Sequence, residues 1–135
     1  MLQLKNLLMK KTLLAFLVIL LVVVACGRTK REKVRNGRTK IDITENYYQY
    51  KFIARFADEK TDRVRGFLRQ KLASPSLLDQ TRFNDNVALR SGTNIKLRLR
   101  PGYLEMRLKQ EDRTESEMDE VRDMGESLKK IITKE

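Results

Sequence analysis

The residue types that carry most enzyme chemistry are nearly absent from this chain of 135 residues, which has one cysteine, Cys26, and no histidine. Ser-His and Cys-His nucleophilic pairs, histidine acid–base catalysis and the usual zinc sites all require imidazole or thiolate groups. A lysine or a pair of carboxylates could still act, but no carboxylate pair stands out by its spacing, and the chain has no glycine-rich phosphate loop. We therefore predict a protein that is not an enzyme, with no catalytic residue, no metal site and no cofactor.

The segment that ends at Cys26 has the layout of an export signal. Its positively charged start contains Lys5, Lys10 and Lys11. Residues 12–24 (TLLAFLVILLVVV) then contain no charged side chain, and the small residue Ala25 stands directly before Cys26. A basic start, a short apolar region and a small residue at the cleavage site are the marks of a cleaved secretory signal.

The residues Val23-Val24-Ala25-Cys26-Gly27 resemble the lipobox of bacterial lipoproteins. In that family, lipoprotein signal peptidase cuts before the cysteine, which carries a thioether-linked diacylglycerol and usually an amide-linked acyl chain such as palmitate. The resemblance implies a signal peptide over residues 1–25 and lipid attachment at Cys26. It also implies a location in the cell envelope, with the rest of the chain anchored to a membrane outside the cytoplasm.

Two alternatives to a cleaved lipoprotein signal remain open. An uncleaved anchor is the simpler one, but a spanning helix needs roughly 20 apolar residues, and a run of about 10 to 14 is more typical of a signal peptide. An inverted anchor would place the domain in the cytoplasm. The segment after the apolar run is more basic than the segment before it, which opposes the usual positive-inside bias and favours this inversion.

Residues 26–135 suffice for one small domain. Residues 27–40 (GRTKREKVRNGRTK) contain seven Lys or Arg, one Glu and almost no apolar side chain. Segments of this composition cannot offset the entropy lost on ordering. We therefore predict a lipidated cysteine with a flexible basic tether over residues 26–40 and a single α+β domain over residues 41–135.

The first half of this domain shows a strand followed by a helix. In residues 47–57 (YYQYKFIARFA), apolar side chains alternate with polar ones, the period of two that marks a half-buried strand. The expected inward positions are Tyr48, Tyr50, Phe52, Ala54 and Phe56. Asp58 is expected to cap a helix over residues 58–72, and Pro75 ends it. Residues 84–86 and 91–92 are expected to form turns, with a short edge strand over residues 87–90.

Residues 94–109 (NIKLRLRPGYLEMRLK) give the clearest tertiary signal. With Pro101 and Gly102 as a two-residue turn, the apolar side chains of both strands fall on one face of a hairpin. The expected pairs are Leu99 with Leu104, Leu97 with Met106, and Ile95 with Leu108. Because Pro-Gly favours a type II turn, which suits such a hairpin poorly, a loop wider by one pair is an alternative.

The last element is a long helix that begins with the capping-box spacing of residues 114–117 (TESE). Its apolar stripe comprises Met118, Val121, Gly125, Leu128 and Ile132. Together, these elements predict an α+β fold in the order β-α-β-β-α. Two helices would cover one face of a small, mainly antiparallel sheet of three or four strands.

Such a fold leaves the second face of the sheet open, and the charge of that face is the best functional clue. Seven of its eight predicted outward residues are cationic, and the chain has a net charge of +11, which attracts polyanions. The eight are Lys51, Arg55, Lys96, Arg98, Arg100, Glu105, Arg107 and Lys109. Arg98 could pair with Glu105, whereas Lys96 faces Arg107 as an unfavourable like-charge pair.

We identify Lys96, Arg98, Arg100, Arg107 and Lys109 as a candidate surface for an anionic partner. The alternative is a solvated face whose charges only prevent aggregation.

The sequence therefore predicts a membrane-anchored lipoprotein that acts as a non-enzymatic interaction or assembly module of the cell envelope. Its partners would be the membrane, through Cys26, and an envelope protein or a second copy of the chain. In the second case, the acidic residues 111–126 would meet the basic face of a neighbour. The alternative is a polyanion-binding module for lipid head groups or an envelope polymer. Nucleic acid fits only the inverted anchor and is not favoured, since the chain has no GxxG clamp and no RNP motif.

Overall fold

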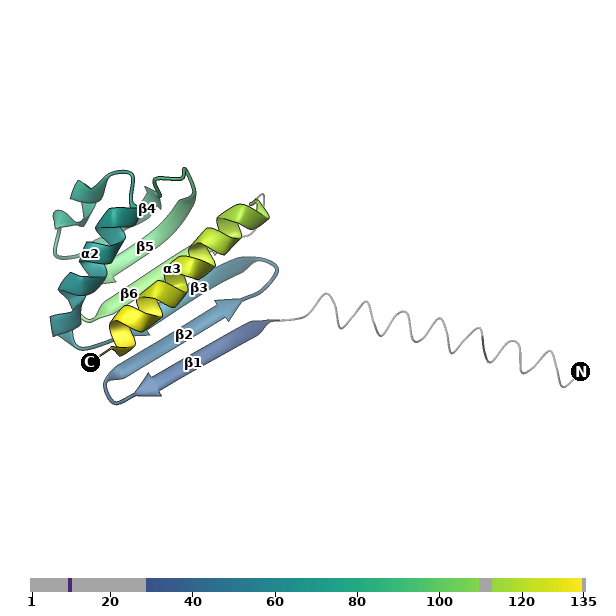
Figure 1. Ribbon diagram of the computed structural model, residues 1–135, viewed down its shortest axis with the longest axis horizontal. Helices are drawn as coiled ribbons and strands as arrows, with labels where there is room; N and C mark the ends of the chain where they lie inside the picture. Colours follow the sequence, from purple (N-terminus) through teal and green to yellow (C-terminus); the bar gives the residue numbers. More distant parts are fainter. Residues whose placement is uncertain (1–9, 11–28, 110–112, 135) are drawn as a thin grey trace, which may run out of the picture.

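The computed structural model describes residues 10, 29–109 and 113–134. Six strands form one antiparallel sheet in the order β1-β2-β3-β6-β5-β4 (Figure 1). They are β1 (Lys30–Asn36), β2 (Thr39–Glu45), β3 (Gln49–Arg55), β4 (Phe83–Ala88), β5 (Asn94–Arg100) and β6 (Tyr103–Lys109). The chain consists of two successive units of three strands and a helix, and these meet at the central β3–β6 pair, where Phe52 lies opposite Met106.

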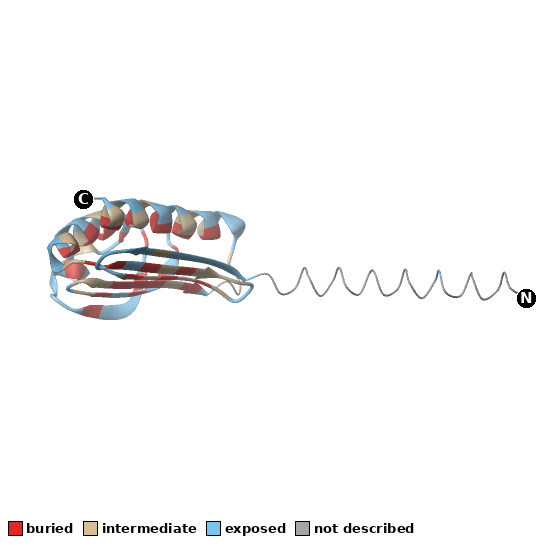
Figure 2. Ribbon diagram, turned by 90° about the horizontal axis from the view of Figure 1, so that it is seen from below, coloured by how far each residue is buried: buried red, intermediate tan, exposed pale blue. Residues whose placement is uncertain are grey.

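Both helices cover the same face of the sheet (Figure 2). A 3-10 turn, η1 (Asp58–Lys60), leads into α2 (Thr61–Lys71), and a second one, η2 (Pro75–Asp79), leads towards β4. The longer helix α3 (Glu115–Thr133) follows β6. The hydrophobic core lies between these helices and the sheet, and no described residue covers the opposite face with a helix.

The prediction of three or four strands in the order β-α-β-β-α is wrong. The fold is α+β, but its sheet has six strands, and its order is β-β-β-α-β-β-β-α. The largest error is the predicted flexible tether, because β1 and the start of β2 occupy residues 30–36 and 39–40.

The physical reason is that β1 is an edge strand that contributes almost nothing to the core. Among its seven residues only Val34 is even partly buried. Backbone pairing with β2 holds β1 in place, with Val34 opposite the buried Ile41. Gly37, with a φ of 58°, takes the first position of the two-residue turn between them, as tight hairpin turns require. Charged side chains on such an edge also oppose pairing with a foreign strand.

Two further predictions in the first half are wrong. Residues 84–86 belong to β4 and form no turn. This strand is the other edge of the sheet, and only Phe83 and Val87 are buried, so it lacks a clear alternating pattern. Asp58 does not cap α2, since it lies in η1, and α2 begins at Thr61 without a side-chain cap.

The strand predicted over residues 47–57 is shorter at both ends, because β3 spans Gln49–Arg55. Tyr48 was expected to point inward, but it lies in the β2–β3 loop and is 66% exposed. Three of the other inward positions, Tyr50, Phe52 and Ala54, are buried in β3 as predicted.

The predicted hairpin and two of its three predicted apolar pairs are confirmed. Leu99 pairs with Leu104 and Leu97 with Met106, as the apolar pattern requires. Arg100 pairs directly with Tyr103, so the loop has two residues and is not wider. Gly102 adopts a φ of 73°, which a residue with a side chain rarely tolerates.

The predicted helix after residue 114 is also confirmed, and its apolar stripe is buried. The Oγ1 atom of Thr114 accepts a hydrogen bond of 3.3 Å from the backbone N–H of Glu117. At Gly125 the helix lies directly over Tyr50 of β3, whose ring Cζ would be 3.1 Å from a Cβ atom added to this glycine. Gly125 therefore allows α3 to pack closely against the sheet.

Tyr50 makes the stability of the fold sensitive to alkaline pH. Its side chain is almost fully buried under α3, and this burial raises the pKa of the Tyr50 hydroxyl above its ordinary value of 10.0. The nearby carboxylates of Glu126, Glu45 and Glu32 raise this pKa further, against the opposing charge of Arg122.

We expect the free energy of unfolding to fall as the pH rises above 10, because the unfolded chain releases the Tyr50 proton while the folded protein retains it. The contribution of this single group is at most about 1.4 kcal/mol per pH unit. Urea unfolding of wild type and Tyr50→Phe between pH 8 and pH 11 measures it. The variant should lose less stability than wild type over this range, and parallel curves would contradict the assignment.

Candidate anion-binding face

The helix-free face of the sheet carries eleven Lys and Arg side chains, from five strands, and two carboxylates. Cross-strand pairing places these side chains on the side opposite the buried residues. The cations are Arg31, Lys33, Arg35, Lys40, Lys51, Arg55, Lys96, Arg98, Arg100, Arg107 and Lys109, and the carboxylates are Asp42 and Glu105. They come from β1, β2, β3, β5 and β6, with the first four cations on β1 and β2.

All five residues of the predicted contact surface lie on this helix-free face. The sequence prediction missed the cations of β1 and β2 because residues 27–40 were assigned to a tether. One signal could have found them. Ile41 and Ile43 alternate with polar residues, and the glycine Gly37 shortly before them is a residue that tight hairpin turns favour.

Cross-strand neighbours form three rows on this face, and Lys109 lies beyond them, opposite Gln49. The first lies beside the β1–β2 and β5–β6 turns, and we call it the turn-end row. It consists of Arg35, Lys40, Arg55, Tyr103 and Arg100. The central row consists of Lys33, Asp42, Ile53, Glu105 and Arg98, and the loop-end row, nearer the β2–β3 loop, of Arg31, Thr44, Lys51, Arg107 and Lys96. Both carboxylates lie in the central row, so the turn-end row has four cations and no acid.

Both carboxylates of the central row lie beside an arginine of this face. Asp42 lies 3.8 Å from the guanidinium of Arg31. Glu105 is only 9% exposed, accepts a 3.1 Å hydrogen bond from the Tyr103 hydroxyl and forms a 2.5 Å ion pair with Arg107. Burial alone would raise the pKa of Glu105, but the Tyr103 hydrogen bond and the Arg107 charge outweigh it and hold this pKa below its ordinary value. Glu105 is therefore a fixed anion at neutral pH.

The ion pair suggested between Arg98 and Glu105 does not form, although the two residues are opposite each other in the register. Arg98 instead lies with its guanidinium carbon 5.7 Å from the centre of the Tyr103 ring. Arg100 and Arg55 approach the same ring to 4.4 and 6.0 Å. An aromatic face attracts such cations, so Tyr103 gathers three arginines without neutralising their charge.

The turn that carries Arg100 and Tyr103 is fixed to the start of α2. The backbone N–H of Gly102 donates a 3.0 Å hydrogen bond to the Thr61 hydroxyl, and the Gly102 carbonyl accepts one of 3.0 Å from Phe56. A Cβ atom at Gly102 would lie 2.9 Å from the Phe56 carbonyl oxygen. The end of the turn-end row that contains Arg100 and Tyr103 is thus fixed to the rest of the fold.

Two shallow hollows flank Arg55 on this face. One is lined by Arg55, Asp58, Arg82, Arg100 and Tyr103 together with the β5–β6 turn. The other has Ile53 and the carboxylate Asp42 among its lining residues, with Lys33, Arg35, Lys40 and Arg55 around them. Among the described residues, none of the four turn-end cations has a carboxylate within ion-pair distance.

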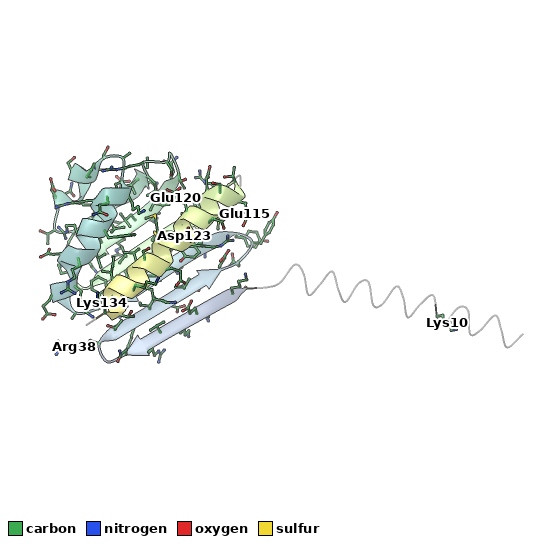
Figure 3. All side chains as sticks on the ribbon, in the orientation of Figure 1. Lys10, Arg38, Glu115, Glu120, Asp123 and Lys134 are labelled. Carbon is green, nitrogen blue, oxygen red and sulfur yellow. The ribbon has the colours of Figure 1, made fainter. Side chains whose placement is uncertain are left out.

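The helix side of the molecule carries acidic side chains. Glu115, Glu120 and Asp123 lie along α3 (Figure 3). Two cations of α3 are paired with strand carboxylates: the Nε of Arg122 donates a 2.8 Å hydrogen bond to Glu45, and Lys129 lies 2.6 Å from Glu32. The unpaired positive charge of the strands is therefore concentrated on the helix-free face.

Cys26, the predicted lipid attachment site, lies outside the described residues. Within the ranges that the structure describes, no helix combines the length and apolar character needed to span a membrane. The same ranges contain no group of three or more residues arranged to hold a metal ion. No family model, no curated protein and no solved structure matches this chain.

Proposed function

We propose that this protein is a lipid-anchored, non-enzymatic interaction module of the bacterial cell envelope whose helix-free face binds an anionic polymer. The observation that carries the binding role is the turn-end row, in which Arg35, Lys40 and Arg55 are cross-strand neighbours, Tyr103 separates them from Arg100, and no carboxylate lies among the four cations. Like charges on neighbouring strands destabilise a sheet. A bound polyanion would relieve this repulsion.

The geometry favours a polymer over a small anion. Neighbouring strands are about 4.8 Å apart, so the turn-end row extends roughly 19 Å from β1 to β5. The hollows along it are shallow and open, and a single phosphate or carboxylate would contact only one or two of the cations. A linear polyanion would contact several at once and release a counterion for each.

The envelope location rests on the lipobox-like residues before and at Cys26. In that location the available polyanions are phosphate-bearing and carboxylate-bearing envelope polymers. If the anchor were inverted, the same face would meet nucleic acid in the cytoplasm.

A charge-removal experiment tests the binding role. The full-length protein in detergent micelles is titrated with length-defined polyphosphate at several salt concentrations. We expect Arg55→Gln/Arg100→Gln to weaken binding by about 10- to 100-fold at low salt and to lower the slope of log K against log salt by about two. Thermal unfolding of the same variant checks that its fold is retained.

The matched control, Arg63→Gln/Lys130→Gln, removes the same charge from exposed positions on α2 and α3. This control should change the affinity for polyphosphate less than threefold, because the polymer does not contact the two charges that it removes. Equal losses in the two variants would show that only the net charge matters and would contradict the proposed site.

Head-to-tail self-association is the second candidate, since the acidic side of α3 could meet the helix-free face of a neighbour. Sedimentation of the same samples distinguishes it. A salt-sensitive oligomer that ignores polyphosphate and is disrupted by Arg55→Gln/Arg100→Gln would favour self-association over polymer binding.

A further inference from the structure

Two tyrosines at the tip of the β2–β3 hairpin are exposed to an unusual degree. Tyr47 and Tyr48 are 79% and 66% exposed, whereas Leu77, the next large hydrophobic residue, is 39% exposed. The two rings form an edge-to-face pair with centres 5.5 Å apart. Asn46 fixes the loop, because its Oδ1 atom accepts hydrogen bonds of 2.9 and 3.0 Å from the N–H groups of Tyr48 and Gln49. We call residues 46–48 the tyrosine tip.

The tyrosine tip lies at the end of the sheet where β1 begins. Lys30, the first residue of β1, pairs with Glu45, the residue directly before the tip (Figure 1). Cys26 precedes Lys30 by only four residues. Fully extended, four residues span at most about 14 Å. A lipid on Cys26 would therefore hold the membrane surface within reach of the tip.

We infer that Tyr47 and Tyr48 insert into the head-group region of the membrane to which the protein is anchored. The inference rests on the proposed lipidation of Cys26, which supplies the membrane at this end of the sheet. Tyrosine suits this position because its ring is apolar and its hydroxyl is polar, and tyrosines gather at membrane–water interfaces for this reason. The hydrogen bonds of Asn46 hold the loop before insertion, so little ordering entropy is lost there.

The charges around the tip are mixed, because the guanidinium of Arg122 is shared among the carboxylates of Glu45, Glu115 and Asp119. The two carboxylates nearest to it on the strands, Glu45 and Glu32, are paired with Arg122 and Lys129 of α3. Lys109, opposite Gln49 at the start of β3, is exposed beside the tip. Membrane proteins use such combinations of tyrosine and lysine at the interface.

The position of the tip at the membrane determines which row of the helix-free face lies away from the membrane. The strands run about 20 Å from the tyrosine tip to the turn-end row, at roughly 3.3 Å per residue. With the lipid and the tip both at one end, the turn-end row lies at the end remote from the membrane. It is then available to a polymer rather than to the lipid head groups of the same membrane.

The chain contains no tryptophan, so one introduced tryptophan reports its own surroundings. The natively processed full-length protein carrying Tyr47→Trp is reconstituted into vesicles of phosphatidylethanolamine and phosphatidylglycerol that contain acyl-brominated phosphatidylcholine. We expect its emission to shift to the blue and to be quenched about twofold relative to unbrominated vesicles, because the tip reaches the acyl boundary. Tyr48→Trp should behave in the same way. Leu77→Trp, in η2, is the matched control and should show neither effect.

Intact mass, measured on the same preparations, separates this inference from the proposed anchor. If Cys26 carries lipid but Tyr47→Trp and Tyr48→Trp match Leu77→Trp in quenching, the tip does not insert and the inference is overturned, while the anchor stands. If Cys26 carries no lipid, the mass overturns the anchor and the inference together.

Discussion

Gly125→Ala is expected to destabilise the protein by about 2 kcal/mol, in the range typical of overpacked cores. An added Cβ atom would overlap the hydroxyl oxygen of Tyr50 and lie 3.5 Å from Cδ2 of Phe52. Tyr50 cannot move away easily, since its ring is buried between α3 and the sheet. The helix must then shift, or the tyrosine must leave its rotamer. Alanine gains about 1 kcal/mol in helix propensity, which offsets only part of this loss.

Gly66→Ala is the matched control for this prediction. Gly66 is also a mid-helix glycine, but it is exposed on α2, and no atom lies within 4 Å of an added Cβ. We expect Gly66→Ala to stabilise the protein by about 0.5 to 1 kcal/mol. Urea unfolding measures both variants. The double variant Gly125→Ala/Tyr50→Phe should recover part of the loss, because the overlapping hydroxyl is gone.

A loss in Gly125→Ala that Tyr50→Phe does not relieve would contradict the assigned contact. Equal effects of alanine at positions 66 and 125 would do the same, since helix propensity would then explain both.

The sequence predicted correctly those elements whose positions depend on buried apolar side chains. In β5 and β6, apolar residues occupy every second position, so that one register alone places Leu97, Leu99, Leu104 and Met106 on a common face. In α3, the stripe from Met118 to Ile132 is buried as the helical period requires. These elements lie in or over the middle of the fold, where burial demands an apolar pattern.

The sequence prediction was wrong at the two edge strands of the sheet, which are held mainly by backbone hydrogen bonds. β1 has a single half-buried apolar residue, Val34, and β4 buries only Phe83 and Val87. Composition rules that identify disordered segments count only what side chains can bury. They cannot register the hydrogen bonds that a neighbouring strand offers to a charged segment.

The same distinction applies to the candidate site. The cations of β5 and β6 could be placed on one face because their strands were recognised, and Lys51 and Arg55 of β3 followed for the same reason. The turn-end row could not be predicted as a unit, because it joins residues of five strands, and two of these residues, Arg35 and Lys40, had been assigned to the tether. The arrangement of three arginines around Tyr103 depends on side-chain positions that no spacing rule specifies.

Cys26→Ala is expected to abolish the covalent attachment of diacylglycerol to the protein. In the natively expressed wild-type protein, we expect an intact mass that corresponds to residues 26–135 with a diacylglycerol on the cysteine. The acyl chains contribute about 0.8 kcal/mol per buried methylene, so that two chains hold the protein firmly in a membrane or a detergent phase. The variant should lose the lipid mass entirely, because alanine has no sulfur to form the thioether.

Arg63→Gln, on the exposed side of α2, is the control and should leave both mass processing and partitioning unchanged. A wild-type protein that retains all 135 residues without added lipid would contradict the lipoprotein prediction. The apolar run over residues 12–24 would then act as an uncleaved anchor, and protease accessibility of the domain would establish on which side of the membrane it lies. In a cytoplasmic domain the helix-free face would be accessible to nucleic acid. The lipidation of Cys26 therefore determines which class of polyanion the turn-end row can bind.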